Sequence, residues 1–139
     1  GGYTVLMTMA TKPGIFKAGI DLFGVSDNFL LAEDTHYLEK FYTYSLVGTL
    51  PEEADKYFCL SPIFHAEKIV DPLLILQGED DPVVPKNQSE LIRDKVKGPV
   101  EYEVYKGEGH GFKKMSSLRD MYARIEKFVK KHVLYSKNK

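Results

Sequence analysis

Asp81 and His110 are the two residues of this sequence best placed to carry out acid–base chemistry together. Asp81 lies in the segment Gly78–Pro85, and His110 lies in the glycine-rich segment Gly107–Phe112. A carboxylate that accepts a hydrogen bond from one imidazole nitrogen fixes the tautomer of the ring, and the other nitrogen can then take a proton from a nucleophile. Either segment alone is an ordinary turn or a flexible connection. Together they make Asp81 and His110 candidate catalytic residues.

The pattern of apolar residues predicts the elements that would position this pair. We expect strands over Ala18–Phe23, Leu73–Leu76 and Val100–Tyr105, and helices over Tyr3–Thr11, Phe29–Val47, Pro51–Phe58, Pro85–Val96 and Ser117–Val133. Such an alternation is typical of an α/β fold, here three parallel strands with flanking helices. Asp81 follows the second strand and His110 follows the third. Because neighbouring parallel strands end at the same edge of a sheet, the fold should bring the two side chains together.

Two of the predicted helices carry more detailed expectations. The aromatic residues of Phe29–Val47 are expected to pack in the core. Ser117, with Asp120 three residues later, resembles a capping box at the start of the last helix. The buried stripe of that helix is expected to consist of Leu118, Tyr122, Ile125, Phe128, Val129 and Val133.

Composition narrows the class of protein. The 139 residues are 43% hydrophobic and 28% charged with a net charge of −1, as in one soluble globular domain with no nucleic-acid partner. No apolar run is long enough to cross a membrane. The single cysteine, Cys59, excludes an internal disulfide and favours a cytoplasmic location. Because His36, His65 and His132 have no metal-ligand spacing, we expect neither a metal nor a cofactor.

A family resemblance extends through nearly the whole chain. The residues that carry it are Gly1–Tyr3, Phe16–Ala18, Gly24–Asp27, Asp34–His36, Ser61–Ile63, Gly78–Pro85 and Gly107–Phe112. With these motifs the chain resembles the α/β-hydrolase catalytic domain of the prolyl oligopeptidase family of serine peptidases. The resemblance is greatest to the branch of acylaminoacyl peptidases and dipeptidyl aminopeptidases.

The register of the acidic motif selects one of two adjacent aspartates. A pattern common in these hydrolases, Gly-x-x-Asp-x-x-Val-Pro, fits Gly78–Pro85 with Asp81 at the acidic position, whereas Asp80 is one residue out of register. Two residues depart from the family. Gln77 stands where many relatives have His, and Pro82 stands where Arg or Asn is frequent.

The resemblance implies that Asp81 and His110 are the acid and the base of a Ser-His-Asp triad. In α/β-hydrolases the Ser occupies a Gly-x-Ser-x-Gly elbow and precedes the Asp and the His in the chain. If Gly1 is the last glycine of that elbow, the Ser lies two positions upstream. Residues 1–139 would then be the C-terminal portion of the peptidase domain, beginning just after the elbow, and inactive alone.

The resemblance also implies partners. Short peptides are the expected substrate, and an upstream half of the catalytic domain and a β-propeller are the expected neighbours. Three strands with one bare edge favour self-association of the isolated chain. Two other functions fit the same residues: an esterase or other small-molecule α/β-hydrolase, and a non-catalytic half-domain that self-associates.

Overall fold

The three predicted strands form one parallel sheet. The computed structural model describes residues 1–34 and 37–135. The strands are β1 (Gly19–Leu22), β2 (Leu73–Gly78) and β3 (Val100–Tyr105), in the order β1-β2-β3. Ile75 of the central strand pairs with Asp21 on one side and with Tyr102 on the other. The fold class and the parallel pairing expected from the sequence are therefore confirmed.

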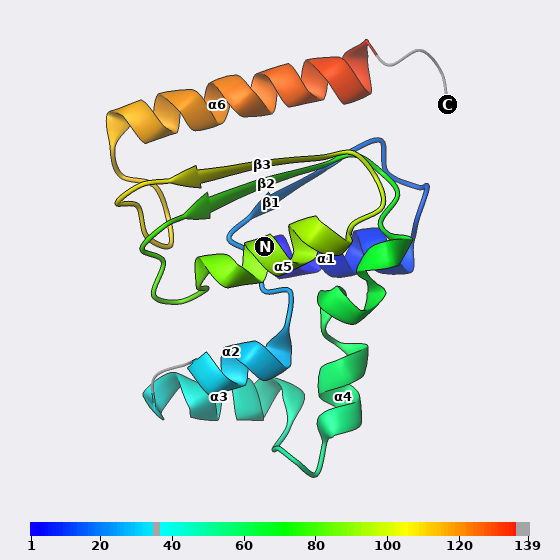
Figure 1. Cartoon of the computed structure of the whole chain (residues 1–139), viewed down its shortest axis with the longest axis vertical. Helices are drawn as coiled ribbons and strands as arrows, with labels where there is room; N and C mark the ends of the chain where they lie inside the picture. Colours follow the sequence, from blue (N-terminus) through cyan, green and yellow to red (C-terminus); the bar gives the residue numbers. More distant parts are fainter. Residues whose placement is uncertain (35–36, 136–139) are drawn as a thin grey trace.

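Helices cover both faces of the sheet (Figure 1). One face carries α1 (Gly2–Thr11), α5 (Lys86–Lys95) and the 3-10 helix η1 (Pro62–Lys68). The other face carries α6 (Met115–Val129), which continues into a π-helical turn, η2 (Lys130–Leu134). The sequence pattern predicts no element over η1.

The central strand belongs to two hydrophobic cores, one on each face of the sheet. All six of its residues are buried. Leu73 and Ile75 pack beneath α1 and η1, whereas Leu74 and Leu76 pack against α6. A run of apolar residues without alternation is what a strand buried on both faces requires.

The segment between β1 and β2 departs from the prediction. In place of one helix over Phe29–Val47 it forms α2 (Asn28–Asp34) and α3 (Tyr37–Val47), followed by α4 (Ala54–Cys59). These helices stand apart from the sheet (Figure 1). Phe41 and Tyr42 are consequently 58% and 66% exposed, so the expected core packing of these aromatic residues is wrong.

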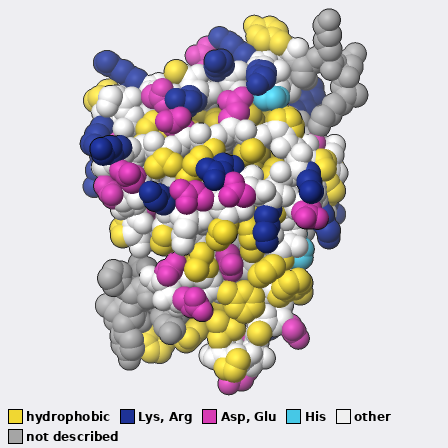
Figure 2. Space-filling view, in the orientation of Figure 1, with side chains coloured by type: hydrophobic (Ala, Val, Ile, Leu, Met, Phe, Trp, Pro, Cys, Tyr) yellow, Lys and Arg dark blue, Asp and Glu magenta, His cyan; other side chains and the backbone are white. Residues whose placement is uncertain are grey.

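Apolar side chains gather on the surface around α4. Figure 2 shows them in the lower part of the molecule. Phe58 and Phe64 are both partly exposed, and their rings stack with centroids 4.5 Å apart. Scattered apolar groups are normal on a protein surface, but a stacked aromatic pair is a larger patch.

The start and stripe of the last helix also differ from the prediction. The N-cap is Lys114, not Ser117, which lies buried inside the first turn. Asp120 accepts a hydrogen bond from the Tyr105 hydroxyl at 2.8 Å and does not cap the helix. Met121 takes the buried position expected for Tyr122, whose side chain is 65% exposed. Tertiary partners have overridden the local pattern in each case.

His36 of the sequence analysis lies outside the described residues. Among those that are described, no helix is both long and apolar enough to span a membrane.

The outer edge of β1 generates the first testable prediction. In the described part of the chain no strand pairs with this edge, and a groove of about 290 Å³ beside it is lined by Val5, Met9 and Phe16. Because unpaired strand edges and apolar grooves favour association, we expect isolated residues 1–139 to form oligomers at micromolar concentration.

Light scattering over a range of concentrations measures this association. Phe16→Lys should reduce it, whereas the matched control Met115→Lys, on an exposed position of α6, should not. A monomer at high micromolar concentration would contradict the expectation.

Candidate active site

Asp81 is positioned by the turn that follows β2. Its Oδ1 accepts hydrogen bonds from the backbone N–H groups of Val83 and Val84, both at 2.8 Å. Its Oδ2 lies 2.8 Å from Nδ1 of His110. The Asp81 side chain has no exposed surface. A buried carboxylate needs such partners, because an unsatisfied charge away from water is costly.

His110 is presented by the glycine-rich loop that follows β3. Gly107 and Gly111 adopt φ angles of 69° and 117°, a region that favours glycine. The Gly111 N–H donates to the Gly109 carbonyl at 3.0 Å and closes a tight turn around the histidine. The His110 side chain is 41% exposed. One ring nitrogen is therefore held by Asp81, and the ring remains open to solvent.

Phe23 supports the histidine ring from the end of β1. Its ring centroid lies 5.0 Å from that of His110 and 5.1 Å from that of Phe112. Phe23 has a φ of 53°, which is rare for a residue other than glycine. Such a backbone costs about 1–3 kcal/mol and persists only where its surroundings hold it. In the sequence, the only signal for Phe23 is its place at the end of a predicted strand.

Gln77 joins the Asp81 turn to the neighbouring helix. Its amide Nε2 donates to the Val84 carbonyl at 2.9 Å and lies 3.4 Å from Oδ2 of Asp81. Its Oε1 accepts a hydrogen bond from the Ser89 hydroxyl at 2.8 Å. Gln77 is fully buried, and its position next to Gly78 in an apolar strand was the available signal. Although Gln77 departs from the family pattern, its side-chain amide still helps to hold the turn that contains Asp81.

The two loops meet at Gly78. A Cβ atom at this residue would lie 2.3 Å from the Gly109 carbonyl oxygen and 2.5 Å from that of Glu108. The Asp80 N–H donates to the same Glu108 carbonyl at 2.9 Å, and the Asp80 side chain is exposed. Of the two adjacent aspartates, only Asp81 directs its carboxylate to His110.

Glu108 anchors the histidine loop from within. Its side-chain oxygens accept hydrogen bonds from the backbone N–H groups of Lys113 and Lys114, at 2.9 and 2.8 Å. The Lys113 amide, together with the Lys114 amide and the Ser117 hydroxyl, lowers the pKa of the Glu108 carboxyl against the opposing effect of burial. Ser117 is predicted to cap α6, but its hydroxyl instead donates a hydrogen bond to the Glu108 carboxylate.

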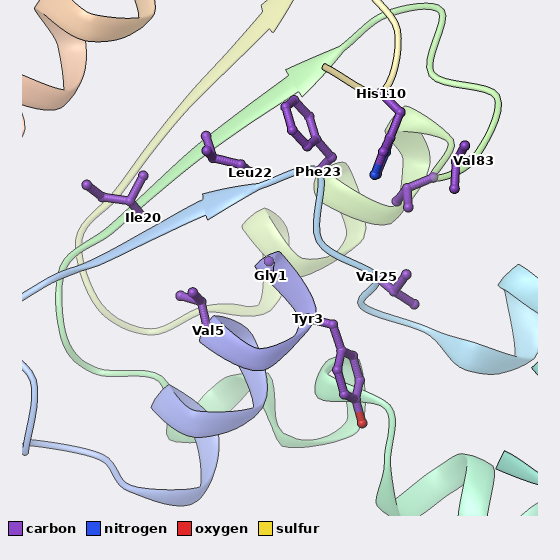
Figure 3. Close-up of a pocket in the computed structure, with 11 residues that line it drawn as sticks. Gly1, Tyr3, Val5, Ile20, Leu22, Phe23, Val25, Val83 and His110 are labelled. Atoms are coloured by element: carbon purple, nitrogen blue, oxygen red, sulfur yellow. The ribbon is translucent and has the colours of Figure 1, made fainter. Parts of the chain in front are cut away.

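The His110 ring faces a cavity (Figure 3). The cavity has a volume of about 550 Å³ and is lined by Gly1 and Gly2 at the start of α1, by Val25, and by Val84 beside His110. A second cavity of about 520 Å³ shares Gly1, Tyr3 and Val25 and extends towards α3. No group of three metal-ligating side chains occurs within residues 1–34 and 37–135.

Comparison with known proteins places the chain among peptidases. Residues 1–135 match the model of the prolyl oligopeptidase family. The chain is 32% identical to dipeptidyl aminopeptidase BIII of Pseudoxanthomonas mexicana over 93% of its length and 20% of that protein. It is 28% identical to dipeptidyl peptidase family member 6 of Caenorhabditis elegans over 93% of its length and 19% of that protein. The chain therefore spans about a fifth of these curated relatives.

The fold of the chain is also similar to that of a peptidase of known structure. The puromycin-hydrolyzing peptidase of Mycobacterium tuberculosis superposes with a TM-score of 0.84 at 37% identity. The superposition covers 95% of this chain and 20% of that one.

Gly78→Ala tests the contact between the two loops. We expect a loss of about 1–3 kcal/mol in the free energy of unfolding, because the added methyl group meets backbone carbonyls that cannot move aside. Urea denaturation measures the loss. Gly109→Ala is the matched control, since its Cβ would meet nothing closer than 3.9 Å. Equal losses of unfolding free energy in the two variants would show that the loops move to make room for the methyl group at Gly78.

Glu108→Gln tests the anchor of the histidine loop. The folded state lowers the pKa of Glu108, so the ionised carboxylate stabilises the fold at pH values above the unfolded-state pKa. This stabilisation is lost as the pH falls through the folded-state pKa. The variant should be less stable than the parent at pH 7, and the difference should disappear in acid. Thermal unfolding between about pH 2 and about pH 7 measures it. A difference that persists below pH 3 would exclude the carboxylate as its source.

Proposed function

The chain belongs to the prolyl oligopeptidase family, and we propose that it supplies the acid, Asp81, and the base, His110, of a serine peptidase. The observation that carries the proposal is the 2.8 Å contact between Asp81 Oδ2 and His110 Nδ1 at the ends of neighbouring strands. The nucleophile of this triad is a serine two positions upstream of Gly1. Membership of the family and the order of elements support that position.

The geometry suits acyl transfer. His110 takes the proton of the serine hydroxyl as its oxygen attacks the carbonyl carbon of the substrate, and later donates that proton to the leaving amine. A water molecule that His110 deprotonates then attacks the acyl carbon, and His110 returns that proton to the serine oxygen as the bond between this oxygen and the acyl carbon breaks and the acid is released. Asp81 stabilises the imidazolium formed in each step, because its Oδ1 is already satisfied by Val83 and Val84 and its Oδ2 faces the ring.

The start of α1 is where the upstream part of the site would connect. Gly1 and Gly2 line the cavity that His110 faces, so a serine two positions before Gly1 would lie close to that cavity (Figure 3). The backbone N–H after such a serine normally contributes to the oxyanion hole. Both the nucleophile and this amide would then lie upstream of Gly1.

The cavities support a peptide substrate with an apolar side chain. The cavity that extends towards α3 is lined by Leu31, Leu46 and Val47, and none of the side chains given for its lining is a charged one. Desolvation would exclude a charged side chain from such a lining. The names of the two curated relatives support cleavage near the amino end of short peptides. We therefore propose short peptides as substrates. We also propose an upstream β-propeller as the structural partner, which the family resemblance implies and which the much greater length of the two curated relatives would accommodate.

A cytoplasmic location completes the proposal. Cys59 is the only cysteine of the sequence and is exposed as a free thiol. An exposed free thiol is best suited to a reducing compartment.

Substitutions in a longer chain that includes the upstream serine test the triad. His110→Ala and Asp81→Asn should each lower kcat by about three or more orders of magnitude, because base and orienting carboxylate act as a unit. Asp80→Asn is the matched control and should have a far smaller effect. Hydrolysis of dipeptide anilides measures turnover. An equal or larger loss at Asp80 would overturn the assignment of Asp81.

Residues 1–139 alone provide the negative control. Without a nucleophile they should hydrolyse neither dipeptide anilides nor acyl esters. Turnover that a serine-directed phosphonate abolishes would mean that the nucleophile lies within the printed sequence.

A further inference from the structure

Asp21 is a buried carboxyl group that the proposed reaction does not use. It lies in β1, has no exposed surface and pairs with Ile75 of the central strand. Neither carboxyl oxygen accepts a hydrogen bond of ordinary geometry within the described residues. Burial raises the pKa of Asp21 to about 7, against the opposing effect of the nearby Gly24 amide. A buried polar group with so little compensation is destabilising, so its presence calls for a reason.

The position of Asp21 is between two glycines. A Cβ atom at Gly2 would lie 2.1 Å from Asp21 Oδ1, and one at Gly24 would lie 2.3 Å from it. Gly2 is in the first turn of α1, and Gly24 lies in the connection from β1 to α2. The carboxyl group thus fills the space between the start of the helix and the end of the strand.

A second close contact holds α1 against the same strand. A Cβ atom at Gly19 would lie 2.1 Å from Sδ of Met9. The helix therefore packs against β1 at two points along its length, through Met9 near its C-terminal end and through Gly2 at its N-terminal end. The first turn is held by the Asp21 contact together with a hydrogen bond of 2.7 Å from the Tyr3 hydroxyl to the Leu60 carbonyl, and of these two contacts only the Asp21 contact relates the turn to β1.

A carboxyl group suits this place electrostatically. The first hydrogen bond within α1 joins the Val5 N–H to the Gly1 carbonyl, so the amides before Val5 have no partner within the helix. No side chain caps α1 locally. The aligned peptide dipoles give this end of the helix a partial positive charge. Asp21 presents an acid to that end from the neighbouring strand.

We propose that Asp21 is a positioning residue that fixes the first turn of α1 relative to His110. Gly2 and His110 line the same cavity, so a displacement of this turn changes the distance from the helix start to the imidazole. The catalytic consequence rests on the proposed function, since it requires the serine that precedes Gly1. The contact itself is a property of residues 1–139.

Hydrogen exchange in residues 1–139 tests the contact without any need for activity. Asp21→Ala should speed exchange of the Gly24 and Tyr3 amides about tenfold or more because it empties the space between the two glycines, and Asp21→Asn should have a smaller effect because its side chain fills that space. Asp71→Asn is the matched control. Asp71 is 1% exposed and accepts a hydrogen bond from the Gly14 N–H at 2.7 Å, in the segment that leads into β2. Unchanged rates at Gly24 and Tyr3 in both Asp21 variants would overturn the proposal.

Steady-state kinetics in the longer, serine-containing chain test the positioning role. Asp21→Ala should lower kcat about tenfold or more with KM within about twofold, while Asp71→Asn should leave kcat unchanged. A kcat equal to that of the parent in both Asp21 variants would refute positioning. If the parent itself shows no turnover while the exchange result holds, the proposed function fails and the Asp21 contact stands.

Discussion

The candidate site depends on one close contact between backbone segments. At Gly78 the end of the central strand lies directly against the carbonyl groups of Glu108 and Gly109, with no space for a side chain between them. This contact sets the separation of two loops that are 29 residues apart in sequence at Asp81 and His110. The side chains complete an arrangement that the main chain has already determined.

Buried polar groups around this contact are satisfied through the main chain. Asp81 accepts hydrogen bonds from two backbone N–H groups, and Glu108 accepts hydrogen bonds from two others. Gln77 donates a hydrogen bond to a backbone carbonyl. Because these partners belong to short loops, each side chain fixes the loop while its own polar atoms are satisfied. Asp21 differs, since it lies between two glycines without an equivalent set of donors.

The sequence predicted those features that follow from topology. Once β2 and β3 were recognised as parallel neighbours, Asp81 and His110 had to reach the same edge of the sheet. Features that depend on tertiary contacts were missed. Ser117 has the local sequence pattern of a helix N-cap, but its hydroxyl donates a hydrogen bond to the carboxylate of Glu108, nine residues earlier in the chain. The position of Phe23 depends on the rings of His110 and Phe112, which no local pattern in β1 specifies.

The central strand also determines how cooperatively the two layers around the sheet unfold. Leu73 and Ile75 belong to one hydrophobic core, and Leu74 and Leu76 belong to the other. Neither core can lose its share of β2 without exposing the apolar residues of the other face to water, so the two layers are coupled into a single cooperative unit. Asp81 follows this strand within three residues of its end. Loss of β2 from either core is therefore expected to separate Asp81 from His110 as well.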